Sequence, residues 1–237
     1  MSAHAITLSR SELVAESTKA FRFVRPPGFE FKAGQAVDLV LPGSAGGAAE
    51  RHAFSIASAP FEQELMVATR MRPSPFKTAL GAMKPGAGAH VEGPFGSLTL
   101  HKAPARDAVF IAGGIGITPF LSILREAAHA RDQRRFSLVY SNRRPEDAAF
   151  LAELQRLERD FTFRLHATMT EMSASQRLWN GETRLVDAAM IGEASSGRRD
   201  PVYYVAGPPP MVAAMRAILV EAGIDEDDVR AEEFFGY

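Results

Sequence analysis

The sequence predicts two domains, an all-β amino-terminal half followed by an α/β carboxy-terminal half. Up to about residue 100, short β-type runs alternate with turn residues such as PPG at 26–28 and KPGAG at 84–88. From residue 107 onward, buried strand patterns alternate with helical patterns, which is typical of a parallel sheet covered by helices. The segment 101–107, HKAPARD, carries proline and charge without apolar periodicity. We therefore place the domain boundary between residues 103 and 104.

Composition limits the classes of function that need to be considered. The 237 residues include 46% hydrophobic residues, the formal net charge is −1, and there is no cysteine. A chain near neutrality is a poor candidate for nucleic-acid binding, which needs a basic surface. Without thiols, disulfides and iron–sulfur clusters are excluded for this chain, so redox chemistry needs an organic cofactor. We expect no metal site, no membrane span and no signal peptide, and hence a cytoplasmic protein.

The amino-terminal half contains short candidate strands at regular spacing. They cover residues 6–13, 18–25, 35–42, 52–58, 64–71 and 89–93, and one short helix is expected over 76–83. Several short strands separated by turns indicate an antiparallel barrel or sandwich.

The carboxy-terminal half alternates strands with helices. We expect strands over 107–114, 136–142, 163–169, 200–207 and 229–235, and helices over 118–132, 145–160 and 209–223. Thr118 is a candidate N-cap for the first of these helices, with Pro119 in its first turn.

The segment GGIGITP at 113–119 joins a predicted strand to a predicted helix. Glycines allow a ligand to approach the backbone, and the N–H groups of a first helical turn attract anions. A phosphate site is therefore one interpretation, and a tight strand–helix turn without a ligand is the other. A second segment of this kind is AGPPPM at 206–211, which places Gly207 and Pro208 after the next apolar strand.

The second strand of this half ends in YSNRR at 140–144. In nucleotide-binding sheets this position meets the adenosine ribose, where an acid selects NAD and an arginine accommodates a 2′-phosphate. Arg143 and Arg144 therefore favour NADPH over NADH. The alternative is that both arginines are solvated or pair with Glu146 and Asp147.

The all-β half contains RHAFSIASAP at 51–60. Arg51 or His52 could meet a pyrophosphate, Phe54 could lie against a flat ring, and Ser55 could hydrogen-bond a ring nitrogen. The alternative is a half-buried strand with Phe54 in the core. The chain ends in EEFFGY, where aromatic rings stand beside carboxylates and can cover a planar ring and supply an acid.

Together these motifs resemble the ferredoxin–NADP reductase superfamily over nearly the whole chain. The matching segments follow the family's order: HAFSIAS, GPFG at 93–96, GGIGITP, YSNRRPED, GPPPM and EEFFGY. The resemblance implies a six-stranded antiparallel barrel that holds FAD in residues 1–103, with FMN as the less favoured flavin. It also implies an α/β domain that holds NAD(P)H in residues 104–237.

The resemblance also assigns residues to the two cofactors. For the flavin they are Arg51, His52, Ala53, Phe54, Ser55, Thr69, Arg70, Lys77 and Thr78. For the nucleotide they are Gly113, Gly114, Gly116, Thr118, Ser141, Asn142, Arg143, Arg144, Gly207 and Pro208. Ser55, Glu232 and Phe234 are the implied catalytic residues, Glu233 with Phe235 fits the same terminal pattern, and Tyr237 is a further stacking candidate.

The chain departs from the family's pattern at several of these positions. His52 and Phe54 stand where the family usually has arginine and tyrosine, and Ala206 replaces a frequent cysteine. The implied activity is hydride transfer from NAD(P)H to FAD, followed by electron delivery to a separate acceptor of ferredoxin, flavodoxin or oxygenase type. Two alternatives remain: a flavin or ferric reductase that serves small acceptors, and a flavin-binding electron-transfer subunit without its own turnover.

Overall fold

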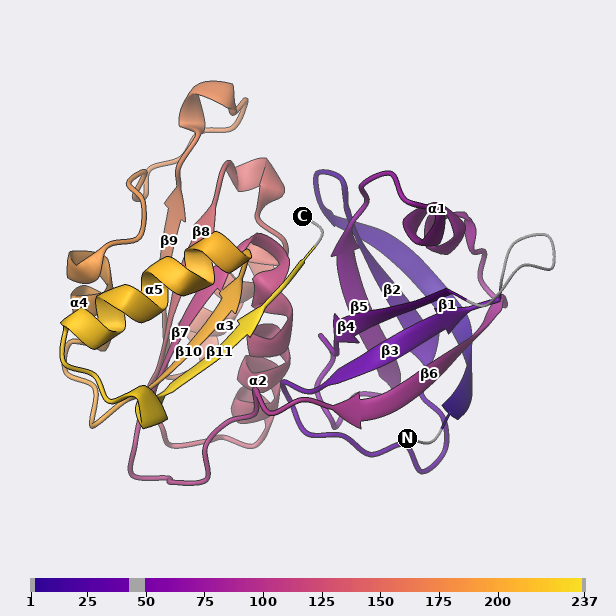
Figure 1. The fold of residues 1–237 in the computed structure, drawn as a ribbon, viewed down its shortest axis with the longest axis horizontal. Coiled ribbons are helices and arrows are strands. Elements are labelled where there is room, and N and C mark those ends of the chain that lie inside the picture. Colours follow the sequence, from indigo (N-terminus) through magenta and orange to yellow (C-terminus); the bar gives the residue numbers. More distant parts are fainter. Residues whose placement is uncertain (1–2, 43–49, 236–237) are drawn as a thin grey trace. The chain divides into compact units, whose positions relative to one another are not determined.

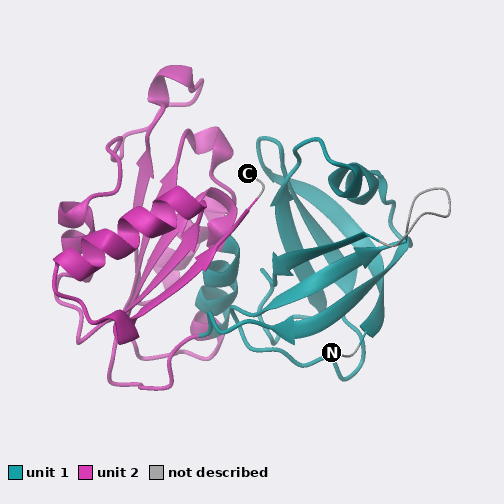
Figure 2. Cartoon of the chain, in the orientation of Figure 1, with its two compact units in different colours: residues 1–99, 118–126 teal, residues 100–117, 127–237 magenta. Residues whose placement is uncertain are grey.

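The computed structural model describes residues 3–42 and 50–235 and divides into two compact units (Figure 2). Unit 1 comprises residues 1–99 with 118–126, and unit 2 comprises residues 100–117 with 127–237. The division of the chain at 103/104 stays a prediction. No sequence pattern indicated that a helical segment at 118–126 groups with the β-rich unit.

Unit 1 is built on a six-stranded antiparallel sheet with the strand order β4-β3-β6-β1-β2-β5 (Figure 1). The strands are β1 (Ala3–Ala15), β2 (Thr18–Val24), β3 (Ala36–Leu41), β4 (Glu50–Ser55), β5 (Glu64–Arg70) and β6 (Gly88–Phe95). The sheet curls so that its two edges approach, since the Ala57 N–H just after β4 donates to the Met66 carbonyl on β5 at 2.7 Å. The predicted six-stranded antiparallel domain is confirmed.

One short helix, α1 (Pro75–Ala82), packs on the core of unit 1. Its start follows the usual rules of capping, because the Ser74 side chain accepts a hydrogen bond from the Lys77 N–H at 3.1 Å and Pro75 occupies the first turn. Phe76 and Leu80, four residues apart and therefore on one helix face, are both buried among the strand side chains.

Unit 2 is a five-stranded parallel sheet with helices, in the strand order β11-β10-β7-β8-β9 (Figure 1). The strands are β7 (Ala108–Gly113), β8 (Phe136–Asn142), β9 (Phe163–Met169), β10 (Val202–Gly207) and β11 (Val229–Glu233). The helices of unit 2 are α3 (Leu151–Asp160), α4 (Ala188–Ser195) and α5 (Pro209–Glu221). Helix α2 (Ile117–His129) follows β7 in the chain, but its residues 118–126 group with unit 1. The predicted α/β fold is confirmed, and β7 and β10 are buried along their whole length, as central parallel strands are.

The strand order reverses between β7 and β10. The chain adds β8 and β9 on one side of β7 and then returns to add β10 and β11 on the other. In open parallel sheets, ligands bind outside the carboxyl ends of the strands at such a reversal. The carboxyl ends of β7 and β10 are therefore the expected ligand position in unit 2.

Several predicted boundaries were wrong. The helix expected over 145–160 is interrupted, because Phe150 adopts a left-handed conformation with φ 61°, and it divides into a 3-10 turn η3 (Pro145–Asp147) and α3. Thr118 is not an N-cap, because it lies inside α2, which follows a 3-10 turn η2 (Gly114–Gly116). The last strand ends at Glu233 rather than at residue 235. Helix α4 was not predicted.

A missed signal precedes α4. Asp187 is its N-cap and accepts a hydrogen bond from the Met190 N–H at 2.8 Å, and Met190, Ile191 and Ala194 are buried. An aspartate followed by a short apolar run is a helix start, but two glycines and several small residues at 192–197 obscured the pattern. Among the described residues, no helix is long and apolar enough to cross a membrane.

A buried carboxylate joins the amino-terminal ends of the central strands of unit 2. Asp107 is fully buried, and its side chain accepts hydrogen bonds from the backbone and side chains of Arg135 and Arg199 at 2.7–3.3 Å. Its own carbonyl accepts from the Val202 N–H at 3.0 Å. Burial by itself raises the pKa of Asp107, but these hydrogen bonds outweigh it and the pKa is lowered. Asp107 therefore stays ionised and fixes the starts of β7, β8 and β10.

We predict that Asp107→Asn destabilises the protein by about 3 kcal/mol, because the two arginines lose a buried ionised acceptor. Chemical denaturation followed by circular dichroism measures the change. Asp160→Asn, at an exposed aspartate at the end of α3, is the control and should change the stability by less than about 0.5 kcal/mol. Equal stabilities of the two variants would contradict the role of Asp107.

Candidate functional site

The glycine turn between β7 and α2 is packed tightly against the turn between β10 and α5. A Cβ on Gly113 would lie 2.3 Å from the Met211 sulfur, and a Cβ on Gly116 would lie 2.3 Å from the Ala206 carbonyl oxygen. A Cβ on Gly207 would lie 3.1 Å from the Gly113 Cα. These glycines therefore bring two backbone segments together at the reversal of the strand order.

Gly114 differs from these glycines because a Cβ at this position would have no atom within 4 Å. Its φ of +53° lies in the left-handed region, which favours glycine. The open side of the turn is therefore bare backbone that leads directly into the first turn of α2. Thr118 and Pro119 in that turn are buried, and the first N–H groups of the helix favour an anion.

Asn142 ends β8 with an unsatisfied side chain. The residue is 6% exposed, and neither its amide nitrogen nor its amide oxygen has a hydrogen-bond partner among the described residues. Its backbone carbonyl accepts from the Thr170 N–H at 2.9 Å, and the preceding Ser141 is half-buried. An orphaned buried amide costs about 1–3 kcal/mol. The site therefore fits a ligand with hydrogen-bonding groups at the edge of β8.

The two arginines after β8 have different partners. Arg144 is paired with Asp147 through two hydrogen bonds of 2.9 and 3.0 Å. The sequence offered this pairing as an alternative to a contact with a 2′-phosphate. Arg143 is exposed and lies 3.4 Å from a Glu171 carboxylate oxygen. The sequence did not point to Glu171. The nucleotide-binding pattern places an acid directly after β8, whereas Glu171 follows β9.

The end of the chain places one carboxylate in a partly buried position. Glu232 on β11 lies opposite Ala206 of β10 and is half-buried, whereas Glu233 is exposed. Burial raises the pKa of Glu232. Phe234 is half-buried and its N–H donates to the Gly207 carbonyl at 2.9 Å, which brings it to the glycine-rich edge.

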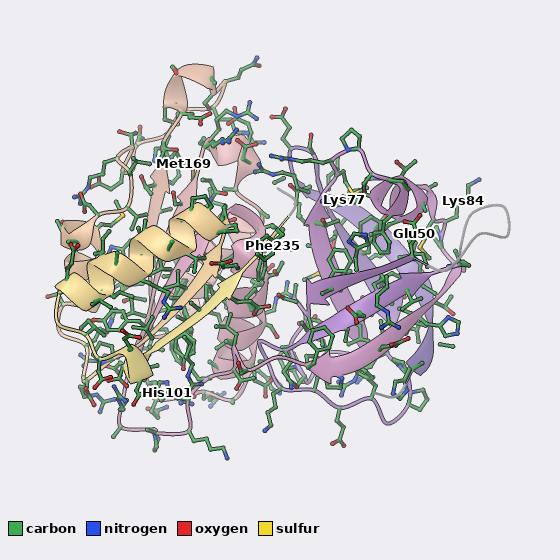
Figure 3. All side chains as sticks on the ribbon, in the orientation of Figure 1. Glu50, Lys77, Lys84, His101, Met169 and Phe235 are labelled. Carbon is green, nitrogen blue, oxygen red and sulfur yellow. The ribbon has the colours of Figure 1, made fainter. Side chains whose placement is uncertain are left out.

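Phe235, the next aromatic residue, is not held in this way. It is 79% exposed and stands at the end of the described chain (Figure 3). Tyr237 lies outside the described residues. Phe234 is thus the terminal aromatic candidate that a backbone hydrogen bond joins to Gly207.

In unit 1, strand β4 presents the predicted flavin motif. The rings of His52 and Phe54 lie 4.3 and 5.8 Å from that of Phe76, so both side chains pack beside α1. Phe54 is half-buried, as the alternative interpretation expected, and it keeps part of its surface accessible. Ser55 is 7% exposed. Ala53, which lies between His52 and Phe54, is exposed.

Arg51 is held by carboxylates. Its guanidinium lies 2.7 Å from Glu92 and 3.8 Å from Asp38. These pairs offset its charge, so the cation that suits a pyrophosphate must come from another element of unit 1.

Cations gather where β5 ends and α1 begins. Burial lowers the pKa of the Lys77 ammonium, and the positive charges of Arg72 and Arg70 lower it further. Lys77, labelled in Figure 3, lies in the first turn of α1, followed by the exposed Thr78. Thr69, next to Arg70, is buried. Clustered cations at a helix amino terminus fit a phosphate group.

The described residues contain no group of three or more histidine, aspartate or glutamate side chains that could hold a metal ion.

Comparisons with known proteins agree with this arrangement. Residues 110–217 match the family model described as the oxidoreductase NAD-binding domain. The chain is 30% identical over 228 residues to ferredoxin–NADP reductase B of Sorangium cellulosum, which covers 90% of this chain and 92% of the relative. It is 31% identical over 226 residues to the reductase component of propane 2-monooxygenase from Rhodococcus jostii, which covers 89% of this chain and 57% of the relative.

A solved structure is also similar. The ferredoxin NADP⁺ reductase of Neisseria gonorrhoeae, determined with bound FAD and NADP, superposes with a TM-score of 0.82 over 98% of this chain and 99% of that chain, at 21% identity. At this identity the likeness shows the fold. An amino-terminal antiparallel sheet followed by a carboxy-terminal parallel sheet is the fold that the chain shares with this reductase. The chain belongs to the ferredoxin–NADP reductase superfamily. It spans 57–61% of the length of the propane 2-monooxygenase reductase components that it matches.

We predict that Gly116→Ala destabilises the protein by about 2 kcal/mol, because the new Cβ overlaps the Ala206 backbone. Gly192→Ala within α4 is the matched control, since its Cβ meets nothing within 4 Å, and it should stabilise the protein by about 0.5–1 kcal/mol. Thermal unfolding of the two variants checks the opposite signs. A neutral Gly116→Ala would mean that the turn can relax away from β10.

We predict a pH-dependent effect of Glu232→Gln. Because the pKa of Glu232 is raised above its ordinary value of 4.5, the folded chain binds more protons than the unfolded chain just above that pH. Stability is therefore lost as pH rises through this window, and the substitution should stabilise the protein more at pH 7 than at pH 4. Denaturation at both pH values measures this. Equal pH-dependent gains in Glu233→Gln, the exposed neighbour, would contradict a specific effect of burial.

Proposed function

We propose that unit 1 binds FAD, that unit 2 binds NAD(P)H, and that the protein passes a hydride from the nucleotide to the flavin and then electrons to a separate acceptor. The glycine turn carries this proposal: Gly114 is open at the reversal of the strand order, directly before a helix amino terminus. Membership of the reductase superfamily and the names of the relatives support it. The proposed acceptor is a ferredoxin- or flavodoxin-type protein or an oxygenase component.

The residues of unit 1 fit the proposed flavin. Lys77 and Arg70, with the first turn of α1, are suited to hold its pyrophosphate, and Thr69 and Thr78 flank them. Phe54 offers an accessible ring surface on β4, and Ser55 is proposed to hydrogen-bond the flavin ring. Arg51 is the least suited of the proposed set, since Glu92 and Asp38 already pair with it. FAD is preferred to FMN because the cationic cluster suits a diphosphate.

The residues of unit 2 fit the proposed nucleotide. Backbone N–H groups from Gly114 to Thr118 are proposed to hold the pyrophosphate, and the orphaned amide of Asn142 is proposed to bind the adenosine side. When bound, the nicotinamide supplies a hydride, and the flavin accepts it and releases electrons singly or in pairs. Glu232, with its raised pKa, is able to hold a proton beside the β10 edge. Phe234 is proposed to cover a planar ring there.

One experiment tests the function as a whole. Protein purified with FAD should be yellow and should bleach when mixed anaerobically with NADPH or NADH in a stopped-flow instrument. Reoxidation by a ferredoxin, a flavodoxin and small acceptors then identifies the acceptor class. Protein that binds flavin but stays yellow with both nucleotides would support an electron-transfer subunit without turnover, and protein that takes up no flavin would overturn the proposal.

We propose that NADPH is preferred to NADH, with Arg143 as the residue that meets the 2′-phosphate. Arg143→Ala should lower the NADPH/NADH ratio of kcat/KM by about tenfold, the value of one charge-assisted contact. Arg144→Ala is the comparison. Arg144 makes two hydrogen bonds of 2.9 and 3.0 Å to Asp147, whereas the contact of Arg143 with Glu171 is longer, at 3.4 Å, so Arg144→Ala should change the ratio less. Steady-state kinetics with both nucleotides decide this. An unchanged ratio in both variants would refute the cofactor argument.

A further inference from the structure

The loops that follow β8 and β9 run side by side. The Thr170 N–H donates to the Asn142 carbonyl at 2.9 Å, and the Glu171 N–H donates to the Arg143 carbonyl at 2.7 Å. These bonds extend the pairing of the two strands beyond their ends. The proposed ribose position lies at the carboxyl end of β8, so both loops border it.

Further along, a single carboxylate bridges the same two loops. Glu146, in the 3-10 turn after β8, accepts hydrogen bonds from the Ser175 hydroxyl at 2.9 Å, the Gln176 N–H at 2.8 Å and the Arg177 N–H at 3.1 Å. Three donors from consecutive residues therefore converge on one side chain. From the sequence, Glu146 was a possible partner of Arg143 or Arg144, and nothing there indicated its contacts with residues 175–177.

The bridge requires an ionised acceptor. Burial alone raises the pKa of Glu146, but the backbone and hydroxyl donors outweigh burial and lower the pKa to about 2. Both backbone N–H groups donate to the same carboxylate oxygen, and the other oxygen accepts from the Ser175 hydroxyl. A glutamine in this place removes the negative charge and replaces one accepting oxygen by an NH₂ group. Because it is nearly the same size as glutamate, it tests the charge of the bridge with little change in packing.

The hydrogen bonds to Glu146 hold the backbone of the loop after β9, and they therefore determine which side chains this loop exposes. Arg177, whose N–H is bound by Glu146, has an exposed side chain, and the next residue, Leu178, is 96% exposed. A side chain this exposed gains nothing from the core, so the loop depends on polar contacts such as those of Glu146 for its shape. Arg143, on the first loop, is three residues before Glu146 in the chain. Both loops thus display cationic side chains from a backbone that one carboxylate holds together.

We propose that Glu146 is a positioning residue for the adenosine half of NAD(P)H. It acts by holding the 170–178 loop against the loop after β8, so that the adenosine side of the nucleotide meets a preformed edge. This inference rests on the proposed nucleotide binding by unit 2. No role in hydride transfer is assigned to Glu146, because its contacts are with loop donors only.

The test compares Glu146→Gln with the wild type, using the full chain purified with FAD. Glu146→Gln should weaken the binding of ADP-ribose, which carries the adenosine and pyrophosphate without nicotinamide, by about tenfold in titration calorimetry. The KM for NAD(P)H should rise by a similar factor while kcat at saturation stays within about twofold. Glu146→Asp, which keeps the charge, should recover part of the affinity. Glu221→Gln, at an exposed position that ends α5, is the matched control and should behave as the wild type.

The possible outcomes separate this inference from the function on which it rests. Unchanged ADP-ribose affinity and KM in Glu146→Gln, or a fall in kcat alone, would overturn the positioning role. If Glu146→Gln does not fold, Ser175→Ala removes one of the donors, and it should weaken ADP-ribose binding by about threefold; an unchanged affinity there would overturn the role as well. Wild-type protein that binds neither ADP-ribose nor NAD(P)H would instead overturn the proposed function.

Discussion

The hydrogen bonds to the buried Asp107 carboxylate determine how the central strands of unit 2 begin. A buried charge is tolerated only when donors surround it, and here the donors come from the residues that precede β8 and β10. Because parallel strands in register share their start and their direction, fixing three amino-terminal ends also fixes where the carboxyl ends lie. The proposed ligand edge at Gly113, Asn142 and Gly207 is therefore set from the opposite end of the sheet.

The carboxyl edge is in turn closely packed, because most of its glycines leave no space for a Cβ. Gly113 and Gly116 have no room for a Cβ, and Gly207 has little, so the two turns at the strand reversal interlock. Of the glycines in these two turns, Gly114 is the one that faces open space, with a backbone conformation that other residues rarely adopt. One glycine segment thus serves two physical needs, close packing on one side and an approachable backbone on the other.

Patterns of burial and turn chemistry predicted the fold class, the parallel sheet and most strands, because these depend on periodicity along the chain. Phe150 shows why the helix boundary failed, since a phenylalanine in the left-handed region has no local signal. Contacts between residues far apart in the sequence could not be predicted either, because no local pattern encodes them. The sequence suggested Asp147 as a partner of the arginines after β8, and Arg144 has that partner. It could not show that Glu171 pairs with Arg143, or that Glu146 binds a loop about 30 residues away.

The grouping of residues 118–126 with unit 1 has a consequence for how the two halves can be separated. The Ser122 hydroxyl donates to the Ser58 carbonyl at 2.6 Å, and Arg125 donates to the Ala57 carbonyl at 3.2 Å. A carboxy-terminal fragment that starts at residue 104 would carry this stretch of α2 without those acceptors. A recombination of either half with a foreign counterpart therefore has to keep residues 118–126 of α2 together with unit 1.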